Sequence, residues 1–198
     1  MKQLRTILWL AVASLLIGLA VILAIKPSLI TPSVNSLATR FGGPFVMTKH
    51  DGTTVTEKDL AGKPYAMFFG FTHCPEICPT TLNELTQTIA QLGADADKMN
   101  FVFVSVDPER DTQELLKDYM ANFDKRIMGL TGTPEQTKAI AKAYSVYYAK
   151  VGDGPDYNMN HTASIYLMNA QGQLAGTLAH QDTDKTRLAK LKRLINNK

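Results

Sequence analysis

The strongest constraint on the fold of this chain is an apolar run that leads into its only two cysteines. Residues 65–71 carry no charged side chain, and Cys74 and Cys78 follow shortly after them. An unbroken apolar run of this length is typical of a strand that is covered on both faces. Beyond the cysteines, apolar residues recur at helical spacing, at Leu82, Leu85, Ile89 and Leu92. The sequence therefore predicts a buried strand that ends at two thiols and continues into a helix.

Two of the expected helices carry end signals. Thr81 and Glu84 have the spacing of a capping box for the helix after the cysteines, and Gly93 is a suitable stop for it. Asp111 and Glu114 have the same spacing at the start of a second helix. We therefore expect Thr81 and Asp111 to be N-caps.

Strand and helix patterns alternate along the rest of the chain. Strands are expected over residues 45–48, 53–56, 65–71, 101–106, 127–130, 144–150, 161–168 and 174–178. The first two are joined by an Asp-Gly pair, which is typical of a hairpin turn. The alternation predicts a central sheet with helices on both faces. A dithiol at a strand–helix junction and a closing antiparallel hairpin and helix predict an α/β, thioredoxin-like fold with an N-terminal hairpin extension.

The N-terminal region has the properties of a membrane anchor. Residues 7–25 carry no charge, and at about 1.5 Å per helical residue the run can cross a hydrocarbon core of roughly 30 Å. Lys2 and Arg5 precede the run, so the positive-inside rule places the N-terminus in the cytoplasm. We predict a single transmembrane helix in the inner (cytoplasmic) membrane and a soluble domain on the periplasmic or outer side. The expected regions are a cytoplasmic N-terminus over residues 1–6, the anchor over 7–25, a linker over 26–43 and the domain over 44–198.

A cleaved signal peptide is the competing interpretation of the same run. The run is long for the core of a signal peptide, and no clear Ala-x-Ala cleavage site follows it. No cysteine lies near it, which excludes lipoprotein processing. The uncleaved anchor is therefore the favoured interpretation.

The net charge of +3 comes entirely from the N-terminal region. Lys2, Arg5 and Lys26 account for it, and the 18 basic side chains that remain balance the 18 acidic ones. A nucleic-acid-binding domain usually carries a marked basic excess. Net charge therefore gives no support for nucleic acid as a partner.

The cysteine pair has the spacing of a reactive site. A structural disulfide is the ordinary interpretation of two cysteines in an exported domain. A bridge between Cys74 and Cys78 would close a very small loop, however, and would constrain little of the unfolded chain. At a helix N-terminus, thiols have lowered pKa values and exist partly as thiolates. Three intervening residues place the two sulfurs about one turn apart on one side, so the pair can bind a soft metal, above all Cu(I), or form a redox-active disulfide.

A third ligand would shield Cu(I) from competing thiols, and the four histidines are the candidates. His50 falls in the predicted hairpin turn, His180 follows the last strand, and the side chain of His73 is expected to point away from its neighbour Cys74. His161 opens the strand that should lie beside residues 65–71, at the end that faces the thiols. We favour His161, although a histidine at a strand start also occurs as a simple hydrogen-bonding residue. Met159 is a softer alternative ligand.

Residues 107–111, Asp-Pro-Glu-Arg-Asp, end the second buried strand and should lie beside the thiols. One interpretation is a capped turn with local ion pairs. The other is that Asp107 or Arg110 tunes the thiolates or docks a partner. The sequence leaves both interpretations open.

Three segments together resemble the Sco/SenC proteins. They are residues 70–79, Gly-Phe-Thr-His-Cys-Pro-Glu-Ile-Cys-Pro, residues 105–112, Ser-Val-Asp-Pro-Glu-Arg-Asp-Thr, and the pair His161-Thr162. The likeness extends from about Gly43 to the end of the chain and includes the N-terminal anchor. None of the three segments would suffice alone, but their combination is specific to the family.

The resemblance implies copper held by Cys74, Cys78 and His161 in a membrane-anchored, thioredoxin-like protein. It also implies a role in building the binuclear copper site of cytochrome c oxidase subunit II. One departure is that Asn160 stands where the family usually has an aspartate before the histidine. This change removes a negative charge near the site and leaves the ligand set intact.

Two functions from different classes follow. The first is a copper metallochaperone that delivers its ion to the oxidase subunit or a similar copper-site protein. The second is an enzyme, a thiol-disulfide reductase that keeps the cysteines of that site reduced, with Cys74 and Cys78 as its redox-active pair and a thiol reductant protein as a further partner. The three-residue spacer and His161 favour the first. No residue singles out a redox or copper sensor, and two cysteines in one loop argue against a peroxiredoxin-like peroxidase.

Overall fold

The computed structural model describes residues 2–25 and 41–196. The chain divides into two compact units, residues 1–37 and residues 38–198. Most of the linker expected over residues 26–43 lies outside the described residues.

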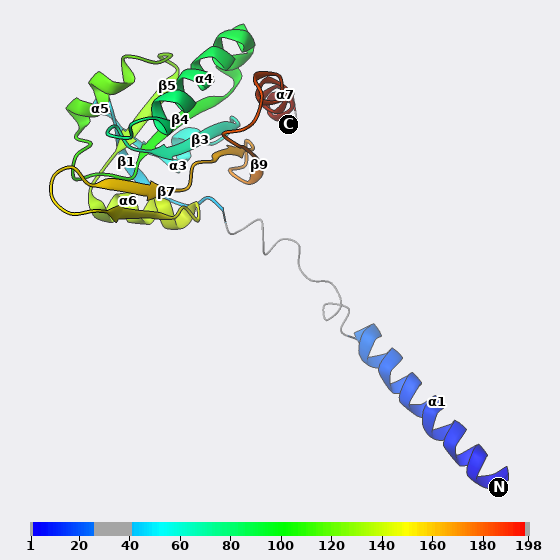
Figure 1. Cartoon of the computed structure of the whole chain (residues 1–198). Helices are drawn as coiled ribbons and strands as arrows, with labels where there is room; N and C mark the ends of the chain where they lie inside the picture. The colour runs from blue at the N-terminus through cyan, green and yellow to red at the C-terminus, as the bar shows by residue number, and fades with distance from the viewer. Residues whose placement is uncertain (1, 26–40, 197–198) are drawn as a thin grey trace. The chain divides into compact units, whose positions relative to one another are not determined.

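The first unit contains a single described helix, α1 (Lys2–Ile25), drawn in blue in Figure 1. Its described side chains include several large apolar groups that are exposed, among them Trp9, Leu10 and Leu15. Among the residues described here, no helix is found that is both long and apolar enough to span a membrane. The transmembrane anchor therefore stays a prediction.

The second unit is built on a seven-stranded sheet with the order β2-β1-β5-β4-β3-β8-β9. The strands are β1 (Val46–Lys49), β2 (Thr54–Thr56), β3 (Tyr65–Gly70), β4 (Asn100–Ser105), β5 (Ile127–Thr131), β8 (Ile165–Met168) and β9 (Leu174–Leu178). Strands β3, β4 and β5 are parallel, and β8 and β1 pair with them in antiparallel fashion at the two sides. The expected N-terminal hairpin is confirmed, with Val46 paired to Thr56. It extends the sheet through the pairing of β1 with β5.

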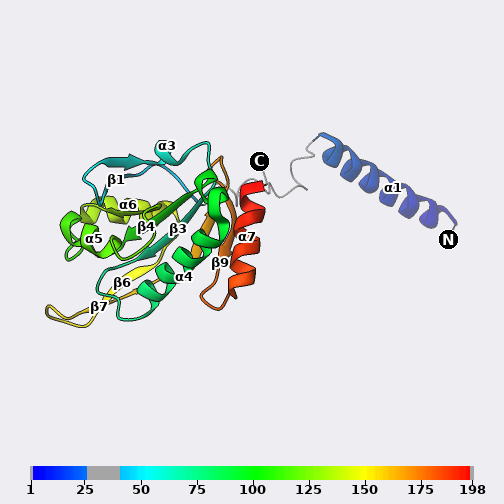
Figure 2. The same ribbon diagram turned by 90° about the horizontal axis from the view of Figure 1, so that it is seen from above.

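Helices cover both faces of this sheet. They are α3 (Glu57–Leu60), α4 (Ile77–Leu92), α5 (Gln113–Met120), α6 (Pro134–Ala143) and α7 (Asp184–Asn196), with a 3-10 helix η2 (Gly93–Lys98) after α4. Helices α4 and α7 pack against each other (Figure 2). Every residue of β3 is buried, as the apolar run predicts. Phe68 packs on Phe103, which in turn packs on Tyr119 of α5. The ring of Phe69 packs on Tyr144 at the end of α6.

The capping box expected at Thr81 and Glu84 is wrong. Helix α4 begins at Ile77, so Thr81 lies inside it and is buried. The Thr81 hydroxyl has no hydrogen-bond partner among the described residues. Glu84 instead forms an ion pair with Arg187 of α7, with 2.6 Å between its Oε2 atom and Nη2 of the arginine. The expected stop at Gly93 is confirmed, with the positive φ of 59° that favours glycine.

The cap expected at Asp111 is also wrong. Thr112 is the N-cap of α5, and its hydroxyl accepts a hydrogen bond from the Leu115 amide. The Asp111 carboxylate is unavailable to the helix because it is buried and bound to other groups.

The strand expected over residues 161–168 is divided in two. His161 ends β7 (Asn158–His161), which pairs with β6 (Tyr148–Val151) in a separate two-stranded sheet. The Thr162 amide donates to the Tyr147 carbonyl, and the Thr162 hydroxyl accepts from the Tyr147 amide. These bonds keep the chain in the hairpin until it crosses to the main sheet as β8. Residues 165–168 then pair with β3, as expected for the final hairpin.

The orphan hydroxyl of Thr81 leads to a stability prediction. We expect Thr81→Val to raise the free energy of unfolding by about 1 kcal/mol, because an isosteric methyl group removes the cost of a buried unpaired hydroxyl. A true N-cap would instead lose about 1 kcal/mol on the same change. Urea unfolding measures the difference.

Thr88→Val is the matched control. Thr88 is buried in the same helix, but its hydroxyl donates to the Glu84 carbonyl at 2.8 Å. The control should therefore give no gain in stability. Equal effects of the two substitutions would contradict the prediction.

Candidate metal centre

The two thiols lie where β3 ends and α4 begins. Cys74 is half-buried in the connecting loop, and Cys78 is fully buried in the first turn of the helix. The Cys78 amide donates to the Cys74 sulfur at 3.4 Å. The Cys74 sulfur therefore occupies the helix N-terminus, where free N–H groups stabilise negative charge.

Gly70 makes room for the buried thiol. A Cβ atom at this position would lie 2.8 Å from the Cys78 sulfur and 2.7 Å from Cε2 of Phe103. Any side chain here would displace the Cys78 sulfur or the Phe103 ring, because both distances are shorter than the van der Waals contact of a Cβ atom with either group. The last residue of β3 thus sets how closely Cys78 approaches the sheet.

His161 comes to the same point from the β6–β7 hairpin. Its Nε2 atom lies 3.6 Å from the Cys78 sulfur, and its Nδ1 atom lies 3.0 Å from the Thr162 carbonyl oxygen. Because a carbonyl only accepts, Nδ1 carries a hydrogen in this contact, and Nε2 is the ring atom that faces the thiols. The rings of Phe68 and Phe71 pack on the imidazole at 6.3 and 5.8 Å between centroids.

Together, Cys74, Cys78 and His161 form a three-ligand group. Their ligand atoms all lie within 4.8 Å of one another, which is compact enough to hold one metal ion. An open cavity of about 280 Å³ lies beside Cys74 and His161. Two sulfurs and one imidazole nitrogen form a soft donor set, which suits Cu(I).

The two thiols differ in proton affinity. Hydrogen bonds from the Cys78 thiol, from the His161 imidazole and from the amides of Cys78 and Glu76 lower the pKa of Cys74 from 9.0 to about 4. The shared hydrogen bond and burial raise the pKa of Cys78 well above its ordinary value. Cys74 is therefore the thiolate of the pair at neutral pH and Cys78 its hydrogen-bond donor.

The other histidines lie apart from this group. Nδ1 of His73 lies 3.0 Å from the Thr72 hydroxyl and 3.8 Å from the Asp111 carboxylate, so its ring turns away from Cys74 as expected. His50 accepts a hydrogen bond from the Gly129 amide. His180 is exposed after β9.

Strand β7 alternates its side chains around His161. Met159 is buried on the same face as His161 and borders the same cavity. Asn160 is exposed on the opposite face of the strand. The position that departs from the Sco/SenC pattern thus directs its side chain to the other side of the strand from the imidazole, although the residue also borders the cavity.

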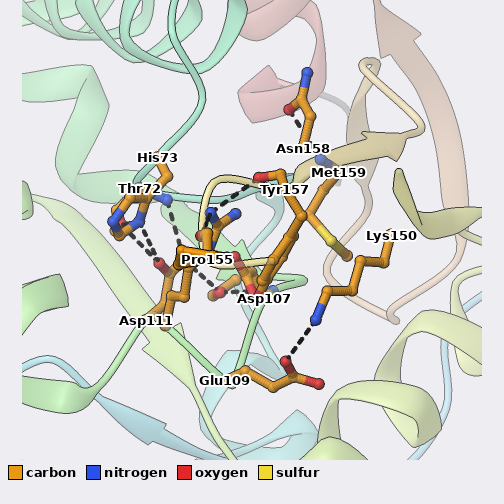
Figure 3. Close-up of polar contacts among 12 residues, drawn as sticks. Thr72, His73, Asp107, Glu109, Asp111, Lys150, Pro155, Tyr157, Asn158 and Met159 are labelled. Carbon is orange, nitrogen blue, oxygen red and sulfur yellow. Dashed lines mark hydrogen bonds and ion pairs between the residues drawn. The ribbon is translucent and has the colours of Figure 1, made fainter. Parts of the chain in front are cut away.

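Asp111 anchors the loop that carries Cys74, a role that sequence reasoning missed. Its carboxylate accepts hydrogen bonds from the Thr72 amide at 3.0 Å and the Thr72 hydroxyl at 2.6 Å (Figure 3). It also accepts a hydrogen bond from the Ser105 hydroxyl at 2.6 Å. Burial raises the pKa of Asp111, and these hydrogen bonds oppose the rise. The bonds tie the start of the loop to the end of β4.

Asp107 and Arg110 form the local ion pair that one sequence interpretation expects, with 2.6 Å between Nε and Oδ2. They also hold the β6–β7 hairpin, which sequence reasoning missed. Arg110 donates to the Tyr157 carbonyl at 2.9 Å, and the Tyr157 hydroxyl donates to Asp107. No signal of sequence spacing connects residues so far apart.

The thiolate character of Cys74 leads to a pH prediction. With a pKa of about 4, Cys74 should react with iodoacetamide at a nearly constant rate from pH 5 to 8 and slow down only as the pH falls through about 4. Cys78 should stay unmodified over the same range because it is buried and protonated. Mass spectrometry of the alkylated peptides separates the two sites. A Cys74 rate that rises roughly tenfold per pH unit, as for an ordinary thiol, would contradict this assignment.

Comparison with known proteins identifies relatives of this chain. The family model described as SCO1/SenC matches residues 34–196. Protein SCO2, mitochondrial, of Saccharomyces cerevisiae is 39% identical over 158 residues, which is 78% of this chain and 52% of that protein. The chain spans about half the length of the first curated relatives it matches.

Solved structures give the same result at the level of the fold. The structure of Bradyrhizobium japonicum ScoI with copper bound is 44% identical, has a TM-score of 0.74 and covers 78% of this chain and 99% of its own. Arabidopsis thaliana ScoI with copper bound is 36% identical, with a TM-score of 0.74 over 80% of this chain and 99% of its own. The fold is therefore thioredoxin-like α/β, and the chain belongs to the SCO1/SenC family.

Proposed function

We propose that this protein is a copper metallochaperone that binds one copper ion through Cys74, Cys78 and His161. The observation that carries the proposal is the convergence of two sulfurs and an imidazole nitrogen within 4.8 Å. The lowered pKa of Cys74 favours its thiolate at neutral pH, and the Nε2 atom of His161 faces the sulfurs. Relatives of similar fold carry copper in their structures.

Cytochrome c oxidase subunit II is the proposed destination of the copper ion. The Sco/SenC resemblance supports this role. The open cavity beside Cys74 also supports it, since an incoming thiolate can approach before the old ligands leave. A three-ligand site favours transfer over storage, because one coordination position remains free for the partner.

Membrane attachment completes the proposal. Residues 7–25 would cross the inner membrane once, residues 26–43 would form a linker, and residues 44–198 would work on the outer side. The uncharged run and the continuous helix α1, with apolar side chains such as Trp9 and Leu15 exposed, support this arrangement.

Thiol-disulfide reduction is the second candidate function. The asymmetric pair favours it, because Cys74 is the nucleophile that could attack a target disulfide and Cys78 lies beside it to resolve the mixed disulfide. The imidazole nitrogen directed at the sulfurs has no necessary role in that chemistry, so the metallochaperone is preferred.

Copper stoichiometry tests the ligand set. We expect the reduced, anaerobic protein to bind one Cu(I) per chain, and His161→Ala to weaken binding by at least roughly tenfold because a first ligand is lost. Cys78→Ser should weaken it further. His73→Ala is the matched control, since His73 is adjacent to Cys74 but turned toward Asp111. Unchanged affinity in His161→Ala would remove His161 from the ligand set. Turnover of a disulfide substrate without copper, at thioredoxin-like rates, would favour the reductase.

Gly70→Ala tests whether the position of the buried thiol matters. The new Cβ would meet the Cys78 sulfur, so we expect Cu(I) affinity to fall roughly tenfold, as is typical when a residue that orients a metal ligand is changed. Gly129→Ala is the control, because its Cβ would crowd Met120 at 2.6 Å on the sheet away from the thiols. Competition with a Cu(I) chelator should show a loss in Gly70→Ala alone. Equal affinities for both variants would refute the positioning role of Gly70.

A further inference from the structure

The three proposed ligands belong to two structural supports. Cys74 and Cys78 are attached to the seven-stranded sheet through β3 and α4. His161 ends β7, which pairs with β6 in a two-stranded sheet of its own. The distance from imidazole to thiols therefore depends on what holds the β6–β7 hairpin against the main sheet.

Tyr157, in the connection between β6 and β7, is the centre of the contacts that hold this hairpin. Its ring is buried between two cations, with Cζ of Arg110 at 3.6 Å and Nζ of Lys150 at 3.7 Å from the ring centroid. Two positive charges this close to one ring centroid would repel each other on the same face, so we place them on opposite faces of the ring. The hydroxyl donates a short hydrogen bond to the Asp107 carboxylate.

Arg110 belongs to the turn after β4, and Lys150 of β6 pairs with a residue of this turn. Nε of Arg110 pairs with Asp107 at 2.6 Å, and Lys150 pairs with Glu109 at 3.1 Å (Figure 3). Arg110 further donates to the carbonyls of Pro155 and Tyr157, at 3.4 and 2.9 Å. The turn at residues 107–110 thus holds one face of the ring through Arg110 and its hydroxyl through Asp107. Lys150 of β6 covers the other face and is tied to the turn through Glu109, and we call this arrangement the Tyr157 clamp.

We propose that Tyr157 is a positioning residue for metal binding, which holds the β6–β7 hairpin so that His161 faces the two thiols. This inference rests on the proposed copper site and adds to it a residue that touches no ligand atom. Tyr157 lies four residues before His161, in the connection of the same hairpin and directly before β7. If the clamp is lost, the hairpin populates positions in which the imidazole is away from the sulfurs. Apparent affinity then falls in proportion to the fraction of molecules that remain competent.

The test compares full-length variants in detergent. Tyr157→Leu removes the ring from between the cations, and Tyr157→Phe removes only the bond to Asp107. Tyr147→Leu is the matched control, because the Tyr147 side chain is 63% exposed next to the same hairpin. The first readout needs no copper: amide hydrogen exchange of β6 and β7 in the metal-free protein, with β3 and β4 as internal reference. The second is Cu(I) affinity by competition with a chelator.

We expect Tyr157→Leu to accelerate exchange in β6 and β7 but not in β3 and β4, and to weaken Cu(I) binding about tenfold, which corresponds to a tenth of the molecules remaining competent. Tyr157→Phe should lose less than about threefold, since the ring still separates the two cations. Tyr147→Leu should change neither readout. Added imidazole should partly restore affinity in Tyr157→Leu, because it replaces a ligand that is present but misplaced.

The outcomes separate this inference from the proposed function. If His161→Ala weakens binding but Tyr157→Leu changes neither exchange nor affinity, the positioning role is overturned and the copper site stands. Accelerated exchange with unchanged affinity also overturns it. If His161→Ala has no effect, the ligand set itself fails. Should Tyr157→Leu loosen β3 and β4 as well, Lys150→Met replaces it, since that side chain is 46% exposed. A Lys150→Met protein with wild-type hairpin exchange and affinity would overturn the proposal.

Discussion

The contact between the Cys78 sulfur and the end of β3 at Gly70 is the constraint on which the site depends. It fixes the first turn of α4 against the sheet, and that turn places the Cys74 sulfur at the helix N-terminus. The hydrogen bond that Cys78 donates to Cys74, together with burial, raises the pKa of Cys78, and the same bond lowers the pKa of Cys74. One packing contact thereby gives two chemically unequal thiols.

The turn after β4 supports the site on both of its sides. Asp111, at the end of this turn, binds Thr72 and so holds the loop that carries Cys74. Asp107 and Arg110, at its beginning, bind Tyr157 and so hold the hairpin that carries His161. A short segment that contributes no ligand thus connects the supports of all three, which explains how a metal site can be built from a sheet and a separate hairpin.

The errors in the sequence-based account share a physical cause. Thr81 and Asp111 both fit the local pattern of an N-cap, but the tertiary fold places one inside a helix and gives the other buried partners. Residues 161–168 read as one strand because no glycine or proline interrupts them, whereas the pairing of Thr162 with Tyr147 divides them. Local pattern is a weak guide wherever a side chain has a stronger partner far away in the chain.

The sequence by itself determined the α/β class, the buried strand before the cysteines, the N-terminal hairpin and the three candidate ligands. These follow from local periodicity, turn chemistry and the spacing of rare residues, all of which are properties of short segments. Only the tertiary structure decided that His161 ends a separate hairpin, that Asp111 anchors the thiol loop and that Tyr157 lies between two cations. Such contacts join residues far apart in the chain, and their partners are chosen by packing, which no local pattern records.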